Sequence, residues 1–246
     1  MRILIANSNT SAFVTEKVGA AARAAASPGV DIVTATGKLG ARIIKTRSQN
    51  AIATYSMLLL LAEHHKGCDA VVIAVSYDTA LAAARELLPI PAVGMTEASL
   101  LTALMLGSKV GVVVVGRRTL PLYRELIDGY GLSARIAGWR AIESAAPYQD
   151  GDQTEADELV AGAARELVDA DGADVVVLTG AVMAGVPSRL QHRVPVPLLD
   201  GITCGVRQAE LLVRFGLKKP SAGSYASPPA TEMVGLPDSL ARLFAK

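Results

Sequence analysis

The chain has 246 residues, 51% of them apolar, and its 24 Lys and Arg residues nearly balance its 23 Asp and Glu residues. This length and apolar content are enough for one large core or two small ones, which argues against a disordered chain. The net charge of +1, without a run of five like charges, argues against a nucleic-acid partner, because phosphate binding needs a basic stripe.

The N-terminus leads directly into a strand-like stretch and lacks the apolar region and cleavage site of a signal peptide. The longest apolar stretch, Met57 to Ala62, is far shorter than a membrane span. Only two cysteines occur, Cys68 and Cys204, and they are far apart in the sequence. This pattern is typical of free thiols in a reducing compartment. We therefore expect a cytoplasmic protein without a membrane partner.

Seven short runs rich in β-branched residues predict strands, and their near-continuous apolar character is typical of parallel strands buried on both faces. The predicted strands are Ile3–Ala6, Val30–Thr34, Ala70–Val75, Pro91–Gly94, Val110–Val115, Asp174–Leu178 and Val196–Leu199. The segments between them have helical spacing of polar and apolar residues: Thr10–Ala26, Arg47–Lys66, Thr79–Leu88, Glu97–Leu106, Leu120–Tyr130, Thr154–Asp171 and Gly201–Phe215. This alternation predicts an α/β protein with doubly wound parallel sheets.

One pattern occurs twice in the chain. A helix leads into Lys66–Ala74 and another into Asp171–Leu178, and a proline-led strand follows each at Pro91 and Pro197. The repeat indicates an internal duplication. We expect two pseudo-symmetric halves, residues 1–96 and 97–207, with the active site in the cleft between them. Residues 208–246, which include the Gly/Pro/Ser-rich stretch 219–229, should return irregularly across the first half.

The first strand is followed by five hydrogen-bonding residues that open a helix: Asn7, Ser8, Asn9, Thr10 and Ser11. Loops at the carboxyl ends of parallel strands are where ligands bind, because free backbone N–H groups and a helix N-terminus meet there. The loop is suited to hold a carboxylate or an imide-like carbonyl. A helix N-cap explains one of these residues but not all five.

The third strand runs into a second polar loop, and the duplication gives that loop a counterpart in the other half. The loops comprise Val75, Ser76, Tyr77, Asp78 and Thr79, and Thr179, Gly180 and Ala181. Facing each other across a cleft, they would suit chemistry that needs one group on each side of a planar intermediate. Asp78 could instead be an N-cap, Ser76 a solvated turn residue and Tyr77 a packed ring.

The order of these motifs resembles that of the hydantoin racemase branch of the Asp/Glu racemase superfamily. The resemblance extends over almost the whole chain, and no single motif in it is very specific. Its landmarks, in chain order, are Asn7–Ser11, Cys68–Ala74, Ala82–Glu86, Pro91–Ala98, Asp171–Asp174, Leu199–Gly201 and Ser224–Pro228. The resemblance implies cofactor-independent proton transfer at a carbon next to a carbonyl, by one cysteine on each face of a small substrate.

The chain departs from the family at those two cysteines. The resemblance places the first on Val75 and the second on Gly180. A shift of one or two residues in the alignment with the family pattern would put Ser76 or Tyr77 at the first position, but no such shift places a cysteine there. Cys68 is expected at the opposite end of its strand, and Cys204 as a buried thiol a turn into the last long helix, although that helix N-terminus could also aim it at the cleft.

Other substitutions fall in the same region, including cations at Lys45 and Arg117. We take Tyr77, Asp78, Lys45 and Ser76 as candidate acid and base groups. Burial or a nearby charge can move the pKa of a Lys or Tyr side chain closer to pH 7. Arg117, Val75, Thr79 and the loop around Gly180 are candidate substrate-binding residues. Lys45 and Arg117 could also be solvated loop residues.

Three hypotheses about function follow. The first is an isomerase or racemase that acts on a hydantoin, amino acid or small carboxylate with non-cysteine acid and base groups. The second is a decarboxylase or ring-opening hydrolase on the same scaffold. The third is an inactive homologue that binds a small molecule through a carboxylate or imide carbonyl. His64, His65 and His192 lack the spacing of a metal site, no cofactor motif is present, and the resemblance favours a homo-oligomer.

Overall fold

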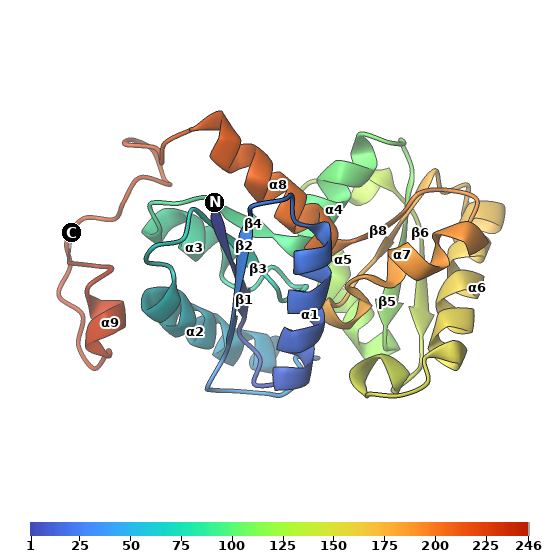
Figure 1. The fold of residues 1–246 in the computed structure, drawn as a ribbon, viewed down its shortest axis with the longest axis horizontal. Helices are drawn as coiled ribbons and strands as arrows, with labels where there is room; N and C mark the ends of the chain where they lie inside the picture. The colour runs from blue at the N-terminus through green and yellow to red at the C-terminus, as the bar shows by residue number, and fades with distance from the viewer. Residues whose placement is uncertain (246) are drawn as a thin grey trace.

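The computed structural model describes residues 1–245 and contains two four-stranded parallel sheets (Figure 1). The strands are β1 (Arg2–Asn7), β2 (Asp31–Thr36), β3 (Ala70–Ile73), β4 (Ala92–Gly94), β5 (Val110–Val115), β6 (Ile136–Ile142), β7 (Val175–Leu178) and β8 (Leu198–Asp200). The strand order is β2-β1-β3-β4 in the first sheet and β6-β5-β7-β8 in the second. The same order in both sheets confirms the predicted α/β architecture of two similar halves.

Helices flank both sheets. The α-helices are α1 (Ala12–Ala25), α2 (Arg47–His64), α3 (Leu81–Leu87), α4 (Met95–Leu104), α5 (Leu120–Gly129), α6 (Thr154–Asp171), α7 (Val186–Leu190), α8 (Gly201–Phe215) and α9 (Asp238–Ala241). Short 3₁₀ turns include η1 (Arg117–Thr119), η3 (Ala146–Tyr148) and η4 (Ala181–Met183). α6 and α8 have the predicted bounds, and the other five predicted helices differ by a few residues at their ends.

Strand β6 was not expected from the sequence. Its segment contains Gly138, Trp139 and Arg140, and most of its residues are only half-buried because it is an edge strand of the second sheet. A half-exposed edge strand lacks the continuous apolar run that marks the central strands. Strand β3 also ends at Ile73, two residues before its predicted end, and this leaves Val75 in the loop.

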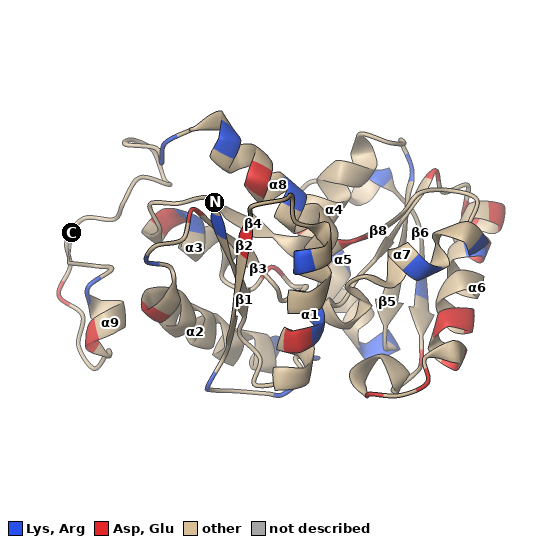
Figure 2. Ribbon diagram, viewed as in Figure 1, with Lys and Arg blue, Asp and Glu red and all other residues tan. Residues whose placement is uncertain are grey.

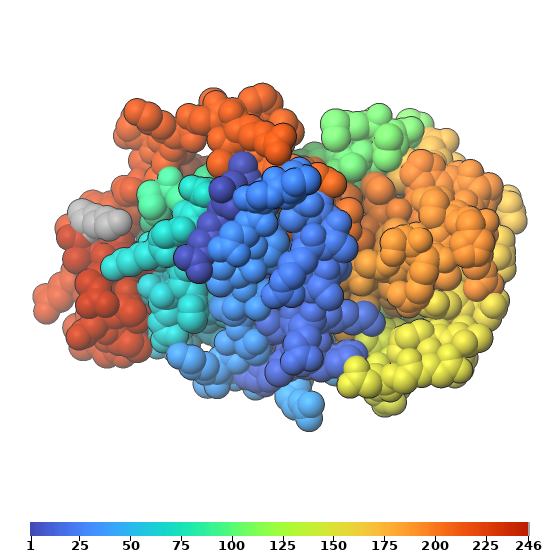
Figure 3. Space-filling view, viewed as in Figure 1, coloured from blue at the N-terminus to red at the C-terminus, as the bar shows by residue number. Residues whose placement is uncertain are grey.

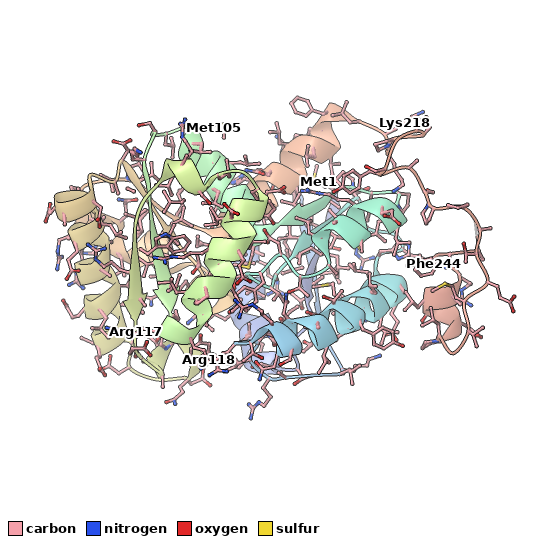
Figure 4. The ribbon with its side chains drawn as sticks, turned by 180° about the vertical axis from the view of Figure 1, so that it is seen from behind. Met1, Met105, Arg117, Arg118, Lys218 and Phe244 are labelled. Atoms are coloured by element: carbon pink, nitrogen blue, oxygen red, sulfur yellow. The ribbon has the colours of Figure 1, made fainter. Side chains whose placement is uncertain are left out.

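The chain crosses back to the first half after β8. Helix α8 packs against β3 and β4 of the first sheet and against α1 and α4. Beyond it, residues 216–237 form no helix or strand, and α9 contacts α2. Figure 3 shows this C-terminal segment against the N-terminal half, and Figure 4 shows Phe244 beside α2. The C-terminal segment thus returns to the first half, whereas the division at residues 96 and 207 stays a prediction.

Positively and negatively charged residues are interspersed along the ribbon (Figure 2). Eleven ion pairs join Lys, Arg or the N-terminus to Asp or Glu in the described chain, and most involve an exposed side chain. Among residues 1–245, no helix is both long enough and apolar enough to cross a membrane.

Candidate active site

The loops that follow the central strands of both sheets line one cavity. The cavity has a volume of about 50 Å³, so its side chains pack closely around it. The lining residues come from both halves: Asn9, Val14, Ile43, Ile44, Val75, Ser76, Tyr77, Val115, Thr119, Tyr123, Tyr148, Gly180, Ala181 and Val182. The two duplicated loops therefore meet, as their positions in the sequence predicted.

Three tyrosines and a serine are among the residues with hydroxyl groups that line this cavity. The hydroxyl groups of Ser76 and Tyr123 lie 2.6 Å apart and share a hydrogen bond across the two halves. The rings of Tyr77 and Tyr123 pack with their centroids 5.0 Å apart. Burial raises the pKa of Tyr77, Tyr123 and Tyr148 above its ordinary value. The three phenols are therefore neutral hydrogen-bond donors near pH 7.

The loop after β1 contributes one amide to the cavity. Asn9 Oδ1 accepts hydrogen bonds from Asn7 Nδ2 and from the backbone N–H of Ser11, each at 3.0 Å. The Nδ2 group of Asn9 has no partner within residues 1–245 and belongs to a residue that lines the cavity. It can therefore donate to a carbonyl or carboxylate oxygen of a ligand.

The remaining wall is apolar. It is formed by Val14, Ile43, Ile44, Val75, Val115 and Val182. No carboxylate, histidine, lysine or cysteine is among the residues that line the cavity. Neutral donors in an apolar surround stabilise an oxyanion more strongly than they would in water. The site is thus equipped to hold a carbonyl compound and its enolate, and it lacks a side chain that is a strong base at neutral pH.

The family model described as Asp/Glu/Hydantoin racemase matches residues 3–209. The chain belongs to the Asp/Glu/hydantoin racemase family. It is 30% identical over 243 residues to the hydantoin racemase of Pseudomonas sp. (strain NS671), with 98% of each chain covered. Among solved structures it resembles allantoin racemase from Klebsiella pneumoniae, with 34% identity, a TM-score of 0.92 and 98% of each chain covered.

A second allantoin racemase, from Pseudomonas fluorescens, is 34% identical with a TM-score of 0.90, and the match covers 96% of this chain and all of that one. Relatives of this kind, together with the family model, identify the chain as a racemase-family enzyme. The recognised family and the expected α/β halves are thus confirmed.

Within this family member, six of the predicted site residues line the cavity. They are Asn9, Val75, Ser76, Tyr77, Gly180 and Ala181. Val75 and Gly180 occupy equivalent places, each two residues beyond the end of β3 or β7. These are the two positions where the resemblance places cysteines, and both face the same cavity. The roles assigned to these residues stay predictions.

Six other predicted binding residues surround the cavity without lining it. Asn7 donates to Thr15 Oγ1, Ser11 caps α1, Thr79 donates to Asn50 Oδ1 and Thr179 donates to the carbonyl of Val113. Ser8 is buried, and Thr10 bonds Ala41 through its backbone. The loop after β1 is therefore mainly a hydrogen-bonded support for Asn9, and Ser11 is the N-cap.

Asp78, Lys45 and Arg117 are outside the cavity lining. The Asp78 carboxylate accepts hydrogen bonds from the backbone N–H groups of Thr96 and Glu97 at the start of α4 and from the Tyr130 hydroxyl. Lys45 is exposed, and its Nζ lies 5.1 Å from the ring centroid of Tyr148, which does line the cavity. Arg117 is exposed at the start of η1, as Figure 4 shows.

Several cavity residues were missed from the sequence. Tyr123 lies on the buried face of α5, where its ring looks like an ordinary core residue in sequence. Tyr148 belongs to η3, in a segment without a strand or helix pattern. The location of Tyr123 one turn into the helix after β5 was a usable signal, because ligands bind beyond the carboxyl ends of strands. Nothing in the sequence around Tyr148 indicated that it reaches the cleft.

Neither cysteine lines the cavity. Cys68 precedes β3, at the end of the strand opposite the site, as expected. Cys204 is buried in α8, and this burial raises the pKa of its thiol to about 11. Its placement agrees with the expectation of a buried thiol and not with the alternative of a thiol aimed at the cleft. Within residues 1–245, no group of three His, Cys, Asp or Glu side chains could hold a metal ion.

Proposed function

We propose that this chain is a cofactor-independent isomerase that exchanges the proton on a carbon next to a carbonyl of a small cyclic imide such as a hydantoin or allantoin. The observation that carries the proposal is the meeting of the two strand-end loops in one cavity, with neutral hydroxyl and amide donors from both halves. The names of the racemase relatives support the substrate class.

In this proposal the donors of the cavity bind the carbonyl oxygen next to the reacting carbon. We assign this role to Asn9 and to the hydroxyls of Tyr77 and Ser76, because all three residues line the cavity. The carbon-bound proton passes to hydroxide or water, the electron pair of the C–H bond forms the enolate, and the donors stabilise its oxygen. A proton from water, or from a hydroxyl that water then replenishes, returns to either face of the planar carbon.

A base-free cavity also suits decarboxylation, and this is the second candidate function. Loss of carbon dioxide requires no proton abstraction from carbon, and an apolar wall destabilises a substrate carboxylate. The wall formed by Val75, Val115 and Val182 favours this reaction. Here the carbon–carbon electron pair becomes the enolate, which takes one proton from a hydroxyl or from water.

A direct test follows the optical activity of enantiopure allantoin and 5-alkyl hydantoins with the purified protein. The proposal expects racemisation faster than the spontaneous rate, and a fall of at least tenfold in Tyr77→Phe, since one donor to an oxyanion contributes about 10²-fold or more. Tyr55 lies on α2 and does not line the cavity, so Tyr55→Phe should racemise these substrates at the rate of the parent protein. Binding without racemisation would instead favour an inactive binding protein. Carbon dioxide release from a malonate-type acid would favour the second candidate.

A further inference from the structure

The turn that carries Ser76 and Tyr77 into the cavity has an unusual backbone. Asp78 has φ 47° and Ala80 has φ 64°, and they are the only non-glycine residues with positive φ within residues 1–245. This left-handed region is sparsely populated by residues with a Cβ, and such conformations persist only where surrounding contacts determine them. The contacts that hold residues 76–80 therefore also hold the cavity-facing side chains.

Helix α4 supplies the first set of contacts. Its backbone N–H groups at Thr96 and Glu97 donate to the Asp78 carboxylate at 3.0 and 2.8 Å. The Thr96 hydroxyl donates to the carbonyl of Ser76 at 2.6 Å. The turn is thus fixed at its backbone and at its acidic side chain by the N-terminus of one helix.

Helix α5 supplies the second set, from the other half of the molecule. The Tyr123 hydroxyl bonds Ser76 Oγ at 2.6 Å, and the Tyr130 hydroxyl donates to Asp78 Oδ2 at 2.7 Å. Tyr130 is the C-cap residue of α5, seven positions after Tyr123, so the two lie on the same side of the helix, and their partners are alternate residues of the turn. On the exposed side of α5, Arg47 of α2 pairs with Glu125.

We propose that Tyr123 and Tyr130 form a two-point latch, through which the second half holds the Ser76–Ala80 turn of the first half in its cavity-facing conformation. Asp78 is then a positioning residue that acts through the turn. The latch itself is a property of the free protein. Only its expected effect on turnover rests on the proposed function.

The latch is tested by hydrogen exchange of the ligand-free protein. The amides of Asp78 and Leu81 are bonded within the turn, to Val75 O and Asp78 O, and report its opening. Tyr130→Phe removes one hydroxyl and keeps the ring, so the fold should persist. Because one hydrogen bond to a carboxylate is lost, exchange of these two amides should rise roughly tenfold. Tyr55→Phe is the matched control.

The amides of β1 and β5 separate a local effect from general destabilisation. Amides of β1 and β5 that exchange through global unfolding should rise no more than the amides of the turn in Tyr130→Phe, because global unfolding breaks the same contact. Exchange of the turn should rise further in the double variant Tyr123→Phe/Tyr130→Phe. Exchange at Asp78 and Leu81 within twofold of the parent protein would overturn the latch, as would a rise in β1 and β5 that exceeds the rise in the turn. These outcomes do not depend on any activity, so a failed proposed function leaves the test intact.

If the proposed function holds, kcat should fall about tenfold in Tyr130→Phe while KM changes less than threefold, because Tyr130 does not line the cavity. Asp78→Asn should lower kcat in the same way, and combining the two substitutions should add little, because both break the same contact. Fully additive losses would contradict the shared latch.

Discussion

A Cβ placed on Gly94 would lie 2.5 Å from the carboxyl carbon of Asp78. Gly94 immediately precedes α4, and only the absence of its side chain lets the carboxylate reach the helix N-terminus. Gly94→Ala should therefore cost about 1–3 kcal/mol of unfolding free energy, the usual penalty for overpacking a core. Urea unfolding measures this loss.

Gly162 is the matched control for that substitution. It lies in α6, and beyond the adjacent residues and the local helix backbone no heavy atom lies within 4 Å of its Cβ position. Gly162→Ala should stabilise the protein by about 0.5–1 kcal/mol, because glycine is unfavourable inside a helix. Equal effects of the two substitutions would show that Asp78 does not need the space beside Gly94.

The stability of the protein should depend on the ionisation of Asp78. Burial raises the pKa of this carboxyl from 3.8 to about 6, although the hydrogen bonds from Tyr130, Thr96 and Glu97 oppose the rise. The charge of Glu97, which pairs with Arg85, adds to the rise in the pKa of Asp78. Because the pKa of Asp78 is higher in the folded state than in the unfolded state, its carboxyl contributes fully to the unfolding free energy below about pH 4. This contribution is lost as the pH rises through about 6.

The measurement is the unfolding free energy of the parent protein and of Asp78→Asn between pH 4 and pH 7. Relative to the variant, the parent should lose up to about 3 kcal/mol over this range, since one pKa unit corresponds to about 1.4 kcal/mol. Parallel curves for the two proteins would mean that Asp78 does not titrate in this range.

Val75→Cys should add a thiol to the cavity with little strain, because cysteine is smaller than valine and Val75 lines the wall. Proton exchange of a bound hydantoin should rise by roughly 10²-fold, which is typical of a positioned acid or base. Val75→Ser is the control, since it adds a hydroxyl without an accessible thiolate. Equal exchange in both variants would argue against the placement of a reacting carbon beside residue 75.

The matching substitution on the other side is less favourable. Gly180 has φ 103°, so Gly180→Cys should lower stability by about 1–2 kcal/mol even though its Cβ has room. Thermal unfolding of the two cysteine variants compares these costs. Equal melting temperatures for both would contradict this expectation.

Lys45 should act on the cavity through Tyr148. A cation over an exposed aromatic ring contributes about 0.5–1 kcal/mol, so Lys45→Met should raise KM about two- to fivefold and leave kcat nearly unchanged. Steady-state kinetics of Lys66→Met, a substitution of an exposed lysine two residues beyond the end of α2, separate this effect from a general effect of charge. A loss of 10²-fold or more in kcat would make Lys45 an acid or base instead.

The sequence was informative where one pattern decides the structure. Buried parallel strands such as Val110–Val115 have continuous apolar runs, and the repeated pattern before β3 and β7 located both cavity loops. It was less informative where tertiary contacts decide. The alternative that Asp78 is an N-cap was partly right. Its carboxylate accepts from a backbone N–H of α4, which is distant in sequence, and not from α3, the helix that directly follows it.

The same limit applies to the aromatic residues. Tyr123, Tyr130 and Tyr148 reach the loop after β3 or the cavity only because the two halves pack together, and spacing along the chain does not encode that approach. Candidate polar residues such as Thr79 and Thr179 were in the right loops but turned towards the protein, because buried hydroxyls need partners.

The most direct test of the account is incubation of the protein with an enantiopure 5-alkyl hydantoin in deuterium oxide, followed by mass spectrometry. The account predicts deuterium at the carbon next to the carbonyl in both enantiomers, faster than in buffer alone and slowed by Tyr77→Phe. Ligand that binds in the cleft but retains its proton and its configuration would contradict it.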